Sequence, residues 1–580
     1  AKGSFIYRLA GRDREKSASY YTPESLTQCL VKYALKELLP GKTAAEILEL
    51  KVCEPAMGSA AFLNEVVNQL AQHYLELRQQ ETGKSIPHEQ FATELQKVKM
   101  RLADQNVFGV DLNPVAVELA EVSLWLNSIF TPEKGRAFVP WFSQQLVCGN
   151  SLIGARRQIY RVNQLPTSTA RSAKPRKLWH EHAPEELAWD AELPDDGIFH
   201  FLLPDPGMAA YTDKVIKQLE PEAIERCKKW NKAFVGDIFT AAQIAHLQRL
   251  SKLVDSLWKD WAKQQQQLRE RTTDPLPVWE DPTGAEEGDW TPLLLKDRIQ
   301  EQEVQGRDVT NTNARLRLKW AMDYWVALWF WPISEANSLP SRDTWLLELS
   351  MILGDLEQGI TLELGQGNLF ADTQPKQLAA DFSDRHGFVD IEKLKTEFDR
   401  LPKVREISNT VRPLHWDLEF ADLAKSGGYD LIIGNPPWVK IEWNTSNELT
   451  DLNPLISIRK MNAIKALESS SKILEDQNSK KKITSEYPLT AGARDFIGSN
   501  SNYIECIGGD PNLSKNFISL GWRLSSKARK SICAFIHPPS IFDDELGTPL
   551  RKQAYRRQIN LFRFRNELKL FDILNTRSFV

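Results

Sequence analysis

The first 155 residues alternate short apolar runs with longer stretches of helical periodicity. The segment "ILELKVCEPAMGSAAFLNEVVNQLAQHYLEL" predicts a strand, a tight turn and a long helix. The segment "NVFGVDLNPVAVELAEVSLWLNSIF" repeats that plan, with a strand that ends at Asp111 and a helix that begins at Asn113 and Pro114. A third strand-like run is "QQLVCGNSLIG". Strands that alternate with helices in this way predict an α/β fold with a parallel, doubly wound sheet.

A further helix is predicted ahead of the first strand. Thr22 is a suitable helix cap, Pro23 suits the first helical position, and Glu24 complements the helix dipole. The apolar periodicity runs from there to Leu39, and Pro40 then ends it.

The alternating pattern breaks between residues 156 and 410. This region is mostly helical and polar in its pattern, and it holds twelve of the 18 tryptophans. Tryptophans at helical spacing are more often core than binding surface, so we expect a large insertion with its own small core. Strand signals then return in "YDLIIGNPPW", "SICAFIHPPSIF" and "INLFRFRNELKLF". We therefore predict one domain built from residues 1–155 and 411–580, which the helical insertion 156–410 interrupts.

Composition narrows the class of protein without fixing it. The 580 residues are 42% hydrophobic and 26% charged, and no segment has the length of a membrane span. The six cysteines form no CxxC pair and have no histidine at zinc-ligand spacing, so we predict no metal site and a reduced, cytoplasmic setting. The net charge is −4, yet residues 523–569 hold eleven Lys or Arg against four acids. Such a stretch fits either a phosphate backbone or an ordinary solvated surface.

The turn "CEPAMGSAAF" is a candidate nucleotide-type site. A strand delivers Glu54 to its end, and the small residues Ala56, Gly58, Ser59 and Ala60 lead into a helix. Small residues let a ligand approach the backbone, and a helix N-terminus offers free N–H groups. The turn is neither a Walker loop nor GxGxxG. The alternative is a tight strand–helix turn whose glycine serves packing alone.

Two further polar residues end predicted strands of the same sheet. Asp111 is placed to accept hydrogen bonds from the two hydroxyls of a ribose, although an aspartate there is also a common cap. Asn150 in "CGNSLIG" is placed to contact an adenine ring, and a plain turn residue is an equal alternative.

The stretch "NPPW", residues 435–438, follows the apolar run 431–433 directly. Asn435 offers a side-chain carbonyl, and Pro436 offers a backbone carbonyl with no competing N–H. Two rigid acceptors suit an exocyclic amino group, because pulling on its N–H bonds frees a lone pair that the ring otherwise conjugates. Trp438 offers a face on which a flipped base can stack. The alternative is a proline-punctuated turn after a strand.

Taken together, these motifs resemble those of the amino-group DNA methyltransferases, whose catalytic motif is Asp/Asn-Pro-Pro-Tyr/Phe/Trp. "YYTPESL", "CEPAMGSAAFL", "FGVDLNPVAVELA" and "PLHWDLEF" before "GGYDLIIGNPPW" are similar to the large adenine-N6 methyltransferases of type IIG restriction enzymes and of the BREX and DISARM phage-defence systems. "DPNLSKNF" and "HPPSIFDDELGTPLRKQAY" continue the likeness, which covers residues 17–155 and 410–580. The resemblance implies a Rossmann-like class I sheet, S-adenosylmethionine as cofactor, and in-line methyl transfer to a flipped adenine in double-stranded DNA.

The resemblance also assigns roles to residues of this chain. It implies catalysis by Asn435, Pro436, Pro437 and Trp438. It implies cofactor binding by Tyr21, Thr22, Pro23, Glu54, Pro55, Ala56, Gly58, Ser59, Asp111, Leu112 and Asn150. The family's loop more often begins with Asp and carries a second glycine, where this chain has Glu54 and Ala60, and Asn150 stands where an acid is usual.

Several expectations about context follow from the same resemblance. We expect a prokaryotic enzyme of restriction-modification or phage defence, with a target-recognition domain beyond residue 580 or on a partner subunit. No PD…ExK nuclease pattern is recognisable. Two alternatives remain: a protein glutamine methyltransferase, because that chemistry also uses an Asn-Pro-Pro-Tyr motif, and a non-catalytic subunit that binds S-adenosylmethionine and DNA in a defence complex.

Overall fold

The computed structural model of the chain describes residues 22–130, 138–166, 178–284, 290–303, 313–355, 391–461, 476–509, 511–566 and 578–580, together with 465, 468–470 and 474. Tyr21, which the sequence assigns to the cofactor segment, lies outside the described residues.

A parallel five-stranded sheet forms the centre of the molecule. Its strands lie in the order β3-β2-β1-β7-β8, and every pair is parallel. Their bounds are β1 Val52–Glu54, β2 Val107–Asp111, β3 Leu146–Cys148, β7 Leu431–Gly434 and β8 Ile532–Phe535. The chain runs outward from β1 to β3 and later returns on the other side of β1, so the strand order reverses between β1 and β7. The predicted α/β sheet is confirmed.

Alternate residues of the central strands belong to two different hydrophobic cores, as the two-residue period of a strand requires. Val52, Val107 and Leu431 belong to one core, whereas Cys53 and Ile432 belong to the other. Both faces of the sheet are therefore covered, which explains why its strands are mostly apolar up to polar ends such as Glu54 and Asp111.

The N-terminal helices cover the first of these faces. They are α2 Glu24–Leu38, α3 Ala44–Glu49, α4 Ala61–Thr82, α5 His88–Gln105 and α6 Pro114–Ser128. Asn113 caps α6 by accepting from the amide of Val115, with Pro114 at the first position, as the sequence predicts. Pro23 rather than Thr22 occupies the N-cap position of α2, and no side chain caps that helix. The expected capping role of Thr22 is therefore wrong.

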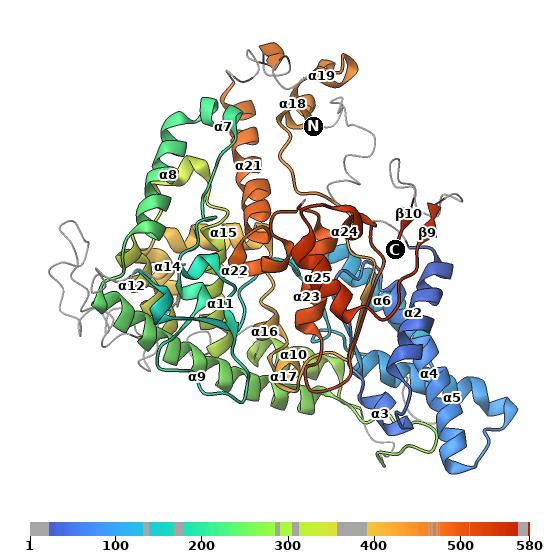
Figure 1. Cartoon of the computed structure of the whole chain (residues 1–580). Coiled ribbons are helices and arrows are strands. Elements are labelled where there is room, and N and C mark those ends of the chain that lie inside the picture. Colours follow the sequence, from blue (N-terminus) through green and yellow to red (C-terminus); the bar gives the residue numbers. More distant parts are fainter. Residues whose placement is uncertain are drawn as a thin grey trace.

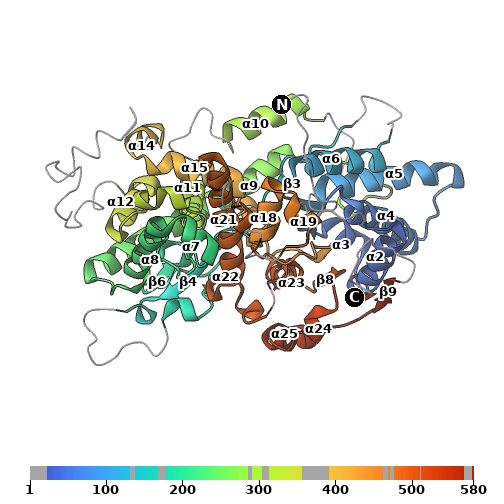
Figure 2. The ribbon, with the colours of Figure 1, turned by 90° about the horizontal axis from the view of Figure 1, so that it is seen from above.

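The insertion is mostly helical, as predicted, but it also contains a small antiparallel sheet. The three strands of that sheet are β4 Gln158–Arg161, β5 Glu185–Glu186 and β6 Gly197–Phe199. The helices are α7 Lys214–Leu219, α8 Pro221–Gly236, α9 Ala241–Thr272, α10 Leu293–Glu303, α11 Ala314–Ala327, α12 Arg342–Leu353, α14 Ile391–Glu397 and α15 Arg400–Val411. Figures 1 and 2 show α7, α8, α11 and α12, in green and yellow, on one side of the molecule and the blue N-terminal helices on the other. Helices α9 and α10 lie nearer the middle in Figure 2.

The insertion shares one core with the central sheet. Trp258, Trp325 and Trp329 are buried in the same cluster as Phe108 of β2 and Ile432 of β7. The tryptophans are core residues, as the sequence indicates, but the expectation of a separate small core is wrong. The second face of the sheet presents apolar side chains that the insertion covers, so the two regions bury one another.

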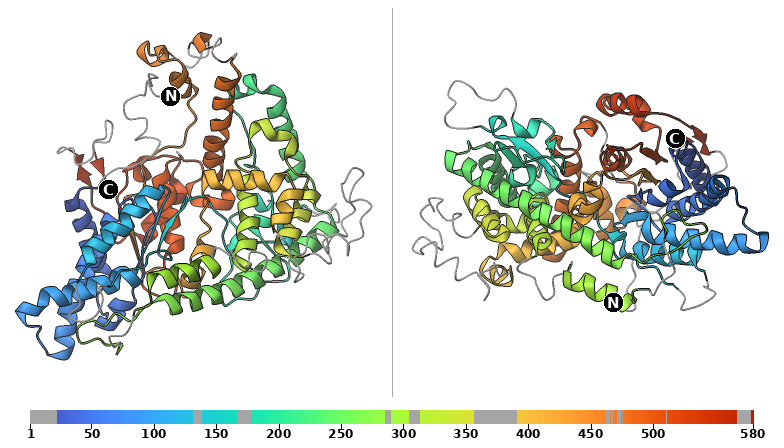
Figure 3. Two further views of the ribbon diagram at one scale, coloured as in Figure 1. Left: turned by 180° about the vertical axis from the view of Figure 1, so that it is seen from behind. Right: turned by 90° about the horizontal axis from the view of Figure 1, so that it is seen from below.

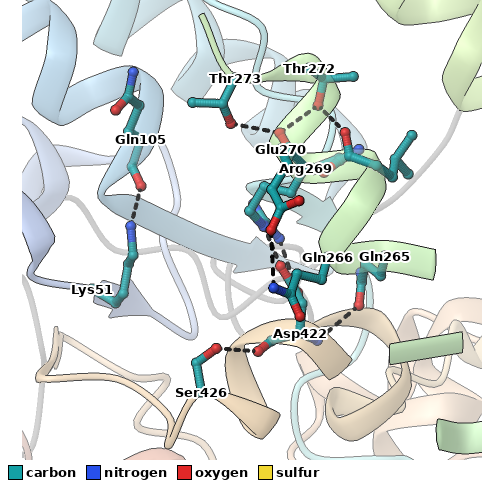
Figure 4. Close-up of polar contacts among 12 residues, drawn as sticks. Lys51, Gln105, Gln265, Gln266, Arg269, Glu270, Thr272, Thr273, Asp422 and Ser426 are labelled. Carbon is teal, nitrogen blue, oxygen red and sulfur yellow. Dashed lines mark hydrogen bonds and ion pairs between the residues drawn. The ribbon is translucent and has the colours of Figure 1, made fainter. Parts of the chain in front are cut away.

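Helix α9 makes much of this contact. It lies along the base of the molecule in Figures 1 and 3, beside α16 Trp416–Glu419 and α17 Ala421–Lys425. The indoles of Trp258 and Trp261 donate to the carbonyls of Asp417 and Leu418, each at 2.8 Å. Figure 4 shows the C-terminal part of α9, where Arg269 pairs with Asp422 of α17. The two indole bonds satisfy backbone carbonyls of α16, and the ion pair holds α17, which lies between α16 and β7.

The C-terminal part adds one strand to the sheet rather than two. "SICAFIHPPSIF" forms β8, as predicted. "INLFRFRNELKLF" gives only β9 Phe564–Arg565 within its described part, and β9 pairs with β10 Ser578–Phe579 in a separate antiparallel ladder. The other helices here are α18 Thr445–Leu452, α19 Leu455–Ile458, α21 Gln477–Ile497, α22 Asn500–Tyr503, α23 Leu513–Leu524, α24 Ser540–Asp543 and α25 Thr548–Arg557. Within the described ranges, none of the helices has the length and apolar character to cross a membrane.

Candidate cofactor and catalytic site

The predicted site residues lie at the carboxyl ends of β1, β2 and β7, beside the point where the strand order reverses. Cys53 of β1 pairs with Phe108 of β2 and with Ile432 of β7, so these three strands end at one edge. Open parallel sheets bind their ligands at this edge, at the switch point. The sequence placed Glu54, Asp111 and Asn435 at strand ends, and the structure brings those ends together.

The loop after β1 is fixed to β2 by backbone and side-chain bonds. The amide of Met57 donates to the carbonyl of Val110 at 3.0 Å, and the amide of Gly58 donates to Asp111 Oδ2 at 2.9 Å. Gly58 has φ +52°, and a Cβ there would meet no atom within 4 Å. A left-handed glycine beside open space leaves the backbone accessible to a ligand.

Ala60 occupies the N-cap of α4 with φ +64°. This is the left-handed region that favours glycine, and it explains why a second glycine is the more frequent residue of the pattern that this loop resembles. Pro55 is buried, Ala56 is half-buried and Ser59 is exposed. The loop therefore keeps the expected shape with one unfavourable residue in it.

Glu54 is a buried carboxyl group at the end of β1. It is 2% exposed, and its Oε2 has no hydrogen-bond partner among the described residues. Burial raises the pKa of Glu54 well above its usual value, the amide of Leu63 opposes that rise, and Asp111 adds to it. A buried carboxylate that lacks a partner is stabilised by a cationic ligand.

Asp111 is fixed at the end of β2 by two amides. Its Oδ2 accepts from Gly58, and its Oδ1 accepts from the amide of Asn113 at 2.8 Å. The carboxylate therefore has a set orientation, and each oxygen keeps a lone pair for a further donor. The neighbouring Leu112 is 50% exposed, so it offers an apolar surface beside this carboxylate.

Asn150 follows β3 and is engaged in local bonds. The backbone N–H of Asn150 donates to the carbonyl of Arg412 at 2.7 Å. The side-chain Oδ1 of Asn150 accepts from the backbone N–H of Leu152 at 3.2 Å. The next residue, Ser151, donates to the carbonyl of Pro55 at 2.6 Å and so fixes this segment to the cofactor loop. Sequence reasoning missed Ser151, because a serine in a turn gives no signal of its distant partner.

Asn435 stands at the end of β7 beside Glu54. A Cβ on Gly434 would lie 3.4 Å from Glu54 Cγ, which shows how closely the two strand ends approach. Asn435 Nδ2 donates to Thr22 Oγ1 at 3.1 Å. Its Oδ1 is buried and accepts no hydrogen bond from the described residues. The side-chain carbonyl is thus held in place by its own amide group and left available to a donor.

The rest of the "NPPW" stretch is also fixed in place. Pro436 is buried, and Pro437 and Trp438 are half-buried. The Trp438 indole donates to the carbonyl of Ile536 at 3.2 Å, and its ring lies 6.0 Å from that of Phe579 at an angle of 40°. The indole is therefore anchored to the segment that follows β8.

Thr22 and Pro23 reach this site from the N-terminal segment before α2. Thr22 is buried against Asn435, whereas Pro23 is half-buried at the start of α2. Among the described residues, no group of three or more His, Cys, Asp or Glu side chains is arranged to hold a metal ion.

An open parallel sheet with an acidic cofactor loop, a second strand-end acid and an Asn-Pro-Pro-Trp stretch beside them defines a class. That class is the S-adenosylmethionine-dependent DNA methyltransferases that act on the N6 amino group of adenine. The chain belongs to the Eco57I restriction-modification methylase family, whose model matches residues 105–571, more than half of the sequence. The N-6 DNA Methylase model matches residues 4–136, and S-adenosylmethionine is the methyl donor of both families.

One relative matches over a shorter stretch. It is a candidate type II restriction enzyme and methyltransferase from Methanocaldococcus jannaschii. The match is 25% identical, and it covers 25% of this chain and 15% of the relative. The matched stretch thus spans well under two thirds of that protein. No solved structure matches the chain.

Proposed function

We propose that this chain is a site-specific DNA adenine-N6 methyltransferase of a prokaryotic cytoplasm, which serves restriction-modification or phage defence. Family membership supports the chemistry. The observation that carries the assignment of the catalytic group is Asn435 Oδ1, a buried acceptor that receives no bond from the described residues and lies beside the cofactor loop. An extruded adenine brings two N–H donors to such an acceptor.

The residues fit S-adenosylmethionine, which supplies a methyl group carried on a positively charged sulfonium. Glu54 would offset the positive charge of the methionine part, because its Oε2 is buried without a partner. Asp111 would accept from the ribose hydroxyls, and Gly58 would let the cofactor approach the backbone. Thr22, Pro23, Pro55, Ala56, Ser59, Leu112 and Asn150 would line the rest of the site.

In this proposal Asn435 and Pro436 raise the reactivity of the adenine amino group. Asn435 Oδ1 and the Pro436 carbonyl accept one hydrogen bond each from its two N–H groups. These hydrogen bonds become stronger as positive charge develops on the nitrogen, so they stabilise the transition state more than the ground state. Pro436 and Pro437 hold the acceptors rigidly, and Trp438 would stack on the flipped base. No general base in the stretch is needed for this step.

The test is methyl transfer from labelled S-adenosylmethionine to unmethylated genomic DNA. Wild type should form N6-methyladenine, and Asn435→Ala should lose roughly 100-fold or more of the rate while it still binds the cofactor. Asn409→Ala, at an exposed position of α15, is the matched control and should keep the wild-type rate.

Other outcomes would point elsewhere. Label in protein glutamine rather than DNA would favour the glutamine methyltransferase reading. Cofactor binding without turnover on any DNA would favour a non-catalytic subunit. A wild-type rate in Asn435→Ala would remove Asn435 from catalysis.

The biological setting is a separate part of the proposal. The relative from M. jannaschii is named as a restriction enzyme as well as a methyltransferase, which supports a restriction-modification context. Membership of the BREX or DISARM systems, a target-recognition domain outside the chain and other defence subunits as partners stay predictions. Co-purification of the tagged protein from its native host would identify such subunits.

A further inference from the structure

A cavity of about 600 Å³ lies away from the catalytic edge of the sheet. It is bounded by the segment before β4, by α16 and α17, and by the end of α23. Tyr429, just before β7, and Ser525, which follows α23 on the way to β8, pair with one another and both line it. These residues precede their strands, whereas Asn435 follows its strand. The cavity therefore lies at the opposite end of the sheet from the candidate cofactor site and shares no lining residue with it.

Two arginines beside this cavity, buried Arg156 and half-buried Arg523, lie close together. The guanidinium carbons of Arg156 and Arg523 stand 4.7 Å and 4.5 Å from the ring centre of Tyr503. Both groups donate to the carbonyl of Asn502, at 2.7 Å and 2.6 Å. The one carboxylate in ion-pair range is Glu505, 3.8 Å from Arg523, among the described residues. Two cations that share a carbonyl are stabilised by an anion between them.

A third arginine in the same wall has unsatisfied donors. Arg157 is 3% exposed. Its Nη2 lies 2.8 Å from Asp255 Oδ1, yet the two groups are not aligned for a hydrogen bond, and Asp255 is shared with Lys259. Arg157 Nε, Nη1 and Nη2 and Arg523 Nη1 have no hydrogen-bond partner in the described part of the chain. Buried donors of this kind are costly unless a ligand satisfies them.

The remaining wall of the cavity is aromatic. Trp416 lies 5.5 Å from Phe420, and Tyr429 lies 6.3 Å from Phe420, between ring centres. The Tyr429 hydroxyl is buried, with no hydrogen-bond partner among the described residues. Half-buried Trp189 lies at the entrance, with its ring centre 4.8 Å from the Arg157 guanidinium carbon. This wall offers ring faces to a planar ligand.

We propose that this cavity binds a small organic anion with a planar ring, and that the class that fits is a nucleoside phosphate. The phosphate would lie on Arg157 and Arg523, and the ring would pack against the aromatic wall. The lining holds five cationic side chains, Arg156, Arg157, Lys425, Arg523 and Lys527, against three acids, Glu186, Asp190 and Asp417. A concave cavity of several hundred Å³ that combines ring faces with charged groups is large enough for such a ligand.

The experiment is calorimetric titration of the full chain with AMP, ADP, ATP and GTP, and with inorganic phosphate. Saturating S-adenosylmethionine is present throughout, so that the cofactor site does not take up the adenine nucleotides. We expect one nucleotide per chain and binding of inorganic phosphate at least roughly tenfold weaker, because base–aromatic stacking alone contributes this much. Arg157→Gln and Trp189→Ala should each weaken nucleotide binding by roughly tenfold or more.

The control for these variants is Arg405→Gln, an exposed arginine of α15, which should bind nucleotide as wild type does. No saturable binding of any nucleotide at millimolar concentration, by protein that binds S-adenosylmethionine, would overturn the proposal. Equal affinity for phosphate and nucleotide would overturn the aromatic half of it. If Arg157→Gln fails to fold, Trp189→Ala at the entrance decides, and wild-type affinity in that variant refutes the site.

Discussion

The side-chain amide of Asn435, at the end of β7, donates to the hydroxyl of Thr22, which precedes it by 413 residues. This bond joins the segment before α2 to the end of β7 across the candidate catalytic site. It fixes the amide plane, so that Asn435 Oδ1 is the oxygen left for a substrate. Thr22 is therefore a positioning residue for Asn435 in the proposed mechanism.

Replacing Thr22 by Val should reduce the rate of methyl transfer with little effect on cofactor affinity. Valine keeps the shape and removes the acceptor, and loss of a neutral hydrogen bond of about 1 kcal/mol corresponds to roughly a fivefold to tenfold slower step. Single-turnover kinetics and S-adenosylmethionine titration measure the two quantities separately. Thr22→Ser, which keeps the hydroxyl, should retain the wild-type rate. Thr410→Val, at an exposed site on α15, should change neither the rate of methyl transfer nor the affinity for S-adenosylmethionine. Weaker cofactor binding at a normal rate would contradict the positioning role, because Thr22 would then act through the cofactor alone.

Because Glu54 is buried at the candidate cofactor site, we expect cofactor binding to release protons. Burial raises the pKa of this carboxyl in the free protein, and a cationic ligand beside it favours the charged form and lowers that pKa. Between the two pKa values the free protein holds a proton that the complex does not, so affinity rises with pH. Calorimetry in two buffers of different ionisation enthalpy counts the protons. Glu54→Gln should abolish the release, and Glu89→Gln, exposed on α5, should keep it.

Gly154 should tolerate no side chain, because the "CGNSLIG" segment packs directly on backbone. A Cβ on Gly154 would lie 2.0 Å from the carbonyl oxygen of Leu414, and Leu414 in turn donates to Ile153 at 2.8 Å. Gly154→Ala should lower the free energy of unfolding by about 2 kcal/mol or more, as measured in urea. The matched control is Gly236→Ala, where a Cβ meets nothing within 4 Å. Equal effects of the two changes would contradict the close packing.

The parts of the fold that sequence predicted are those that neighbouring residues determine. Glu54, Asp111 and Asn435 each end a short apolar run, and parallel strands bring such ends to one edge. The bond from Ser151 to Pro55 and the pairing of Thr22 with Asn435 join distant segments, and local pattern carries no information about them. The helical spacing of the tryptophans in the insertion predicts that they are core residues. Only the structure shows that Trp258 and Phe108 belong to the same core.

The shared core predicts that contacts between α9 and α17 stabilise the whole molecule. Arg269→Met would leave Asp422, 5% exposed, without its cation, and should lower the free energy of unfolding by about 3 kcal/mol. The double variant Arg269→Met/Asp422→Leu should recover part of that loss, because no buried charge then stays unpaired. Lys252→Met, which breaks an exposed pair with Asp195, should change stability by less than about 0.5 kcal/mol. Equal losses from the buried and exposed changes would contradict the account.

Because His200 is buried, we expect the free energy of unfolding to fall in acid. It is buried, its Nε2 accepts from the amide of Arg156 at 2.9 Å, and burial, with Arg156 nearby, lowers its pKa from 6.5 to about 3. Below pH 6.5 the unfolded chain takes up a proton that the folded protein refuses, so the free energy of unfolding falls as pH falls. The slope from this one group approaches about 1.4 kcal/mol per pH unit. Urea unfolding at a series of pH values should show a shallower slope for His200→Gln, which keeps an acceptor, and the wild-type slope for His88→Gln, an exposed site. An unchanged slope in His200→Gln would mean that other buried groups, such as His415, account for the acid sensitivity.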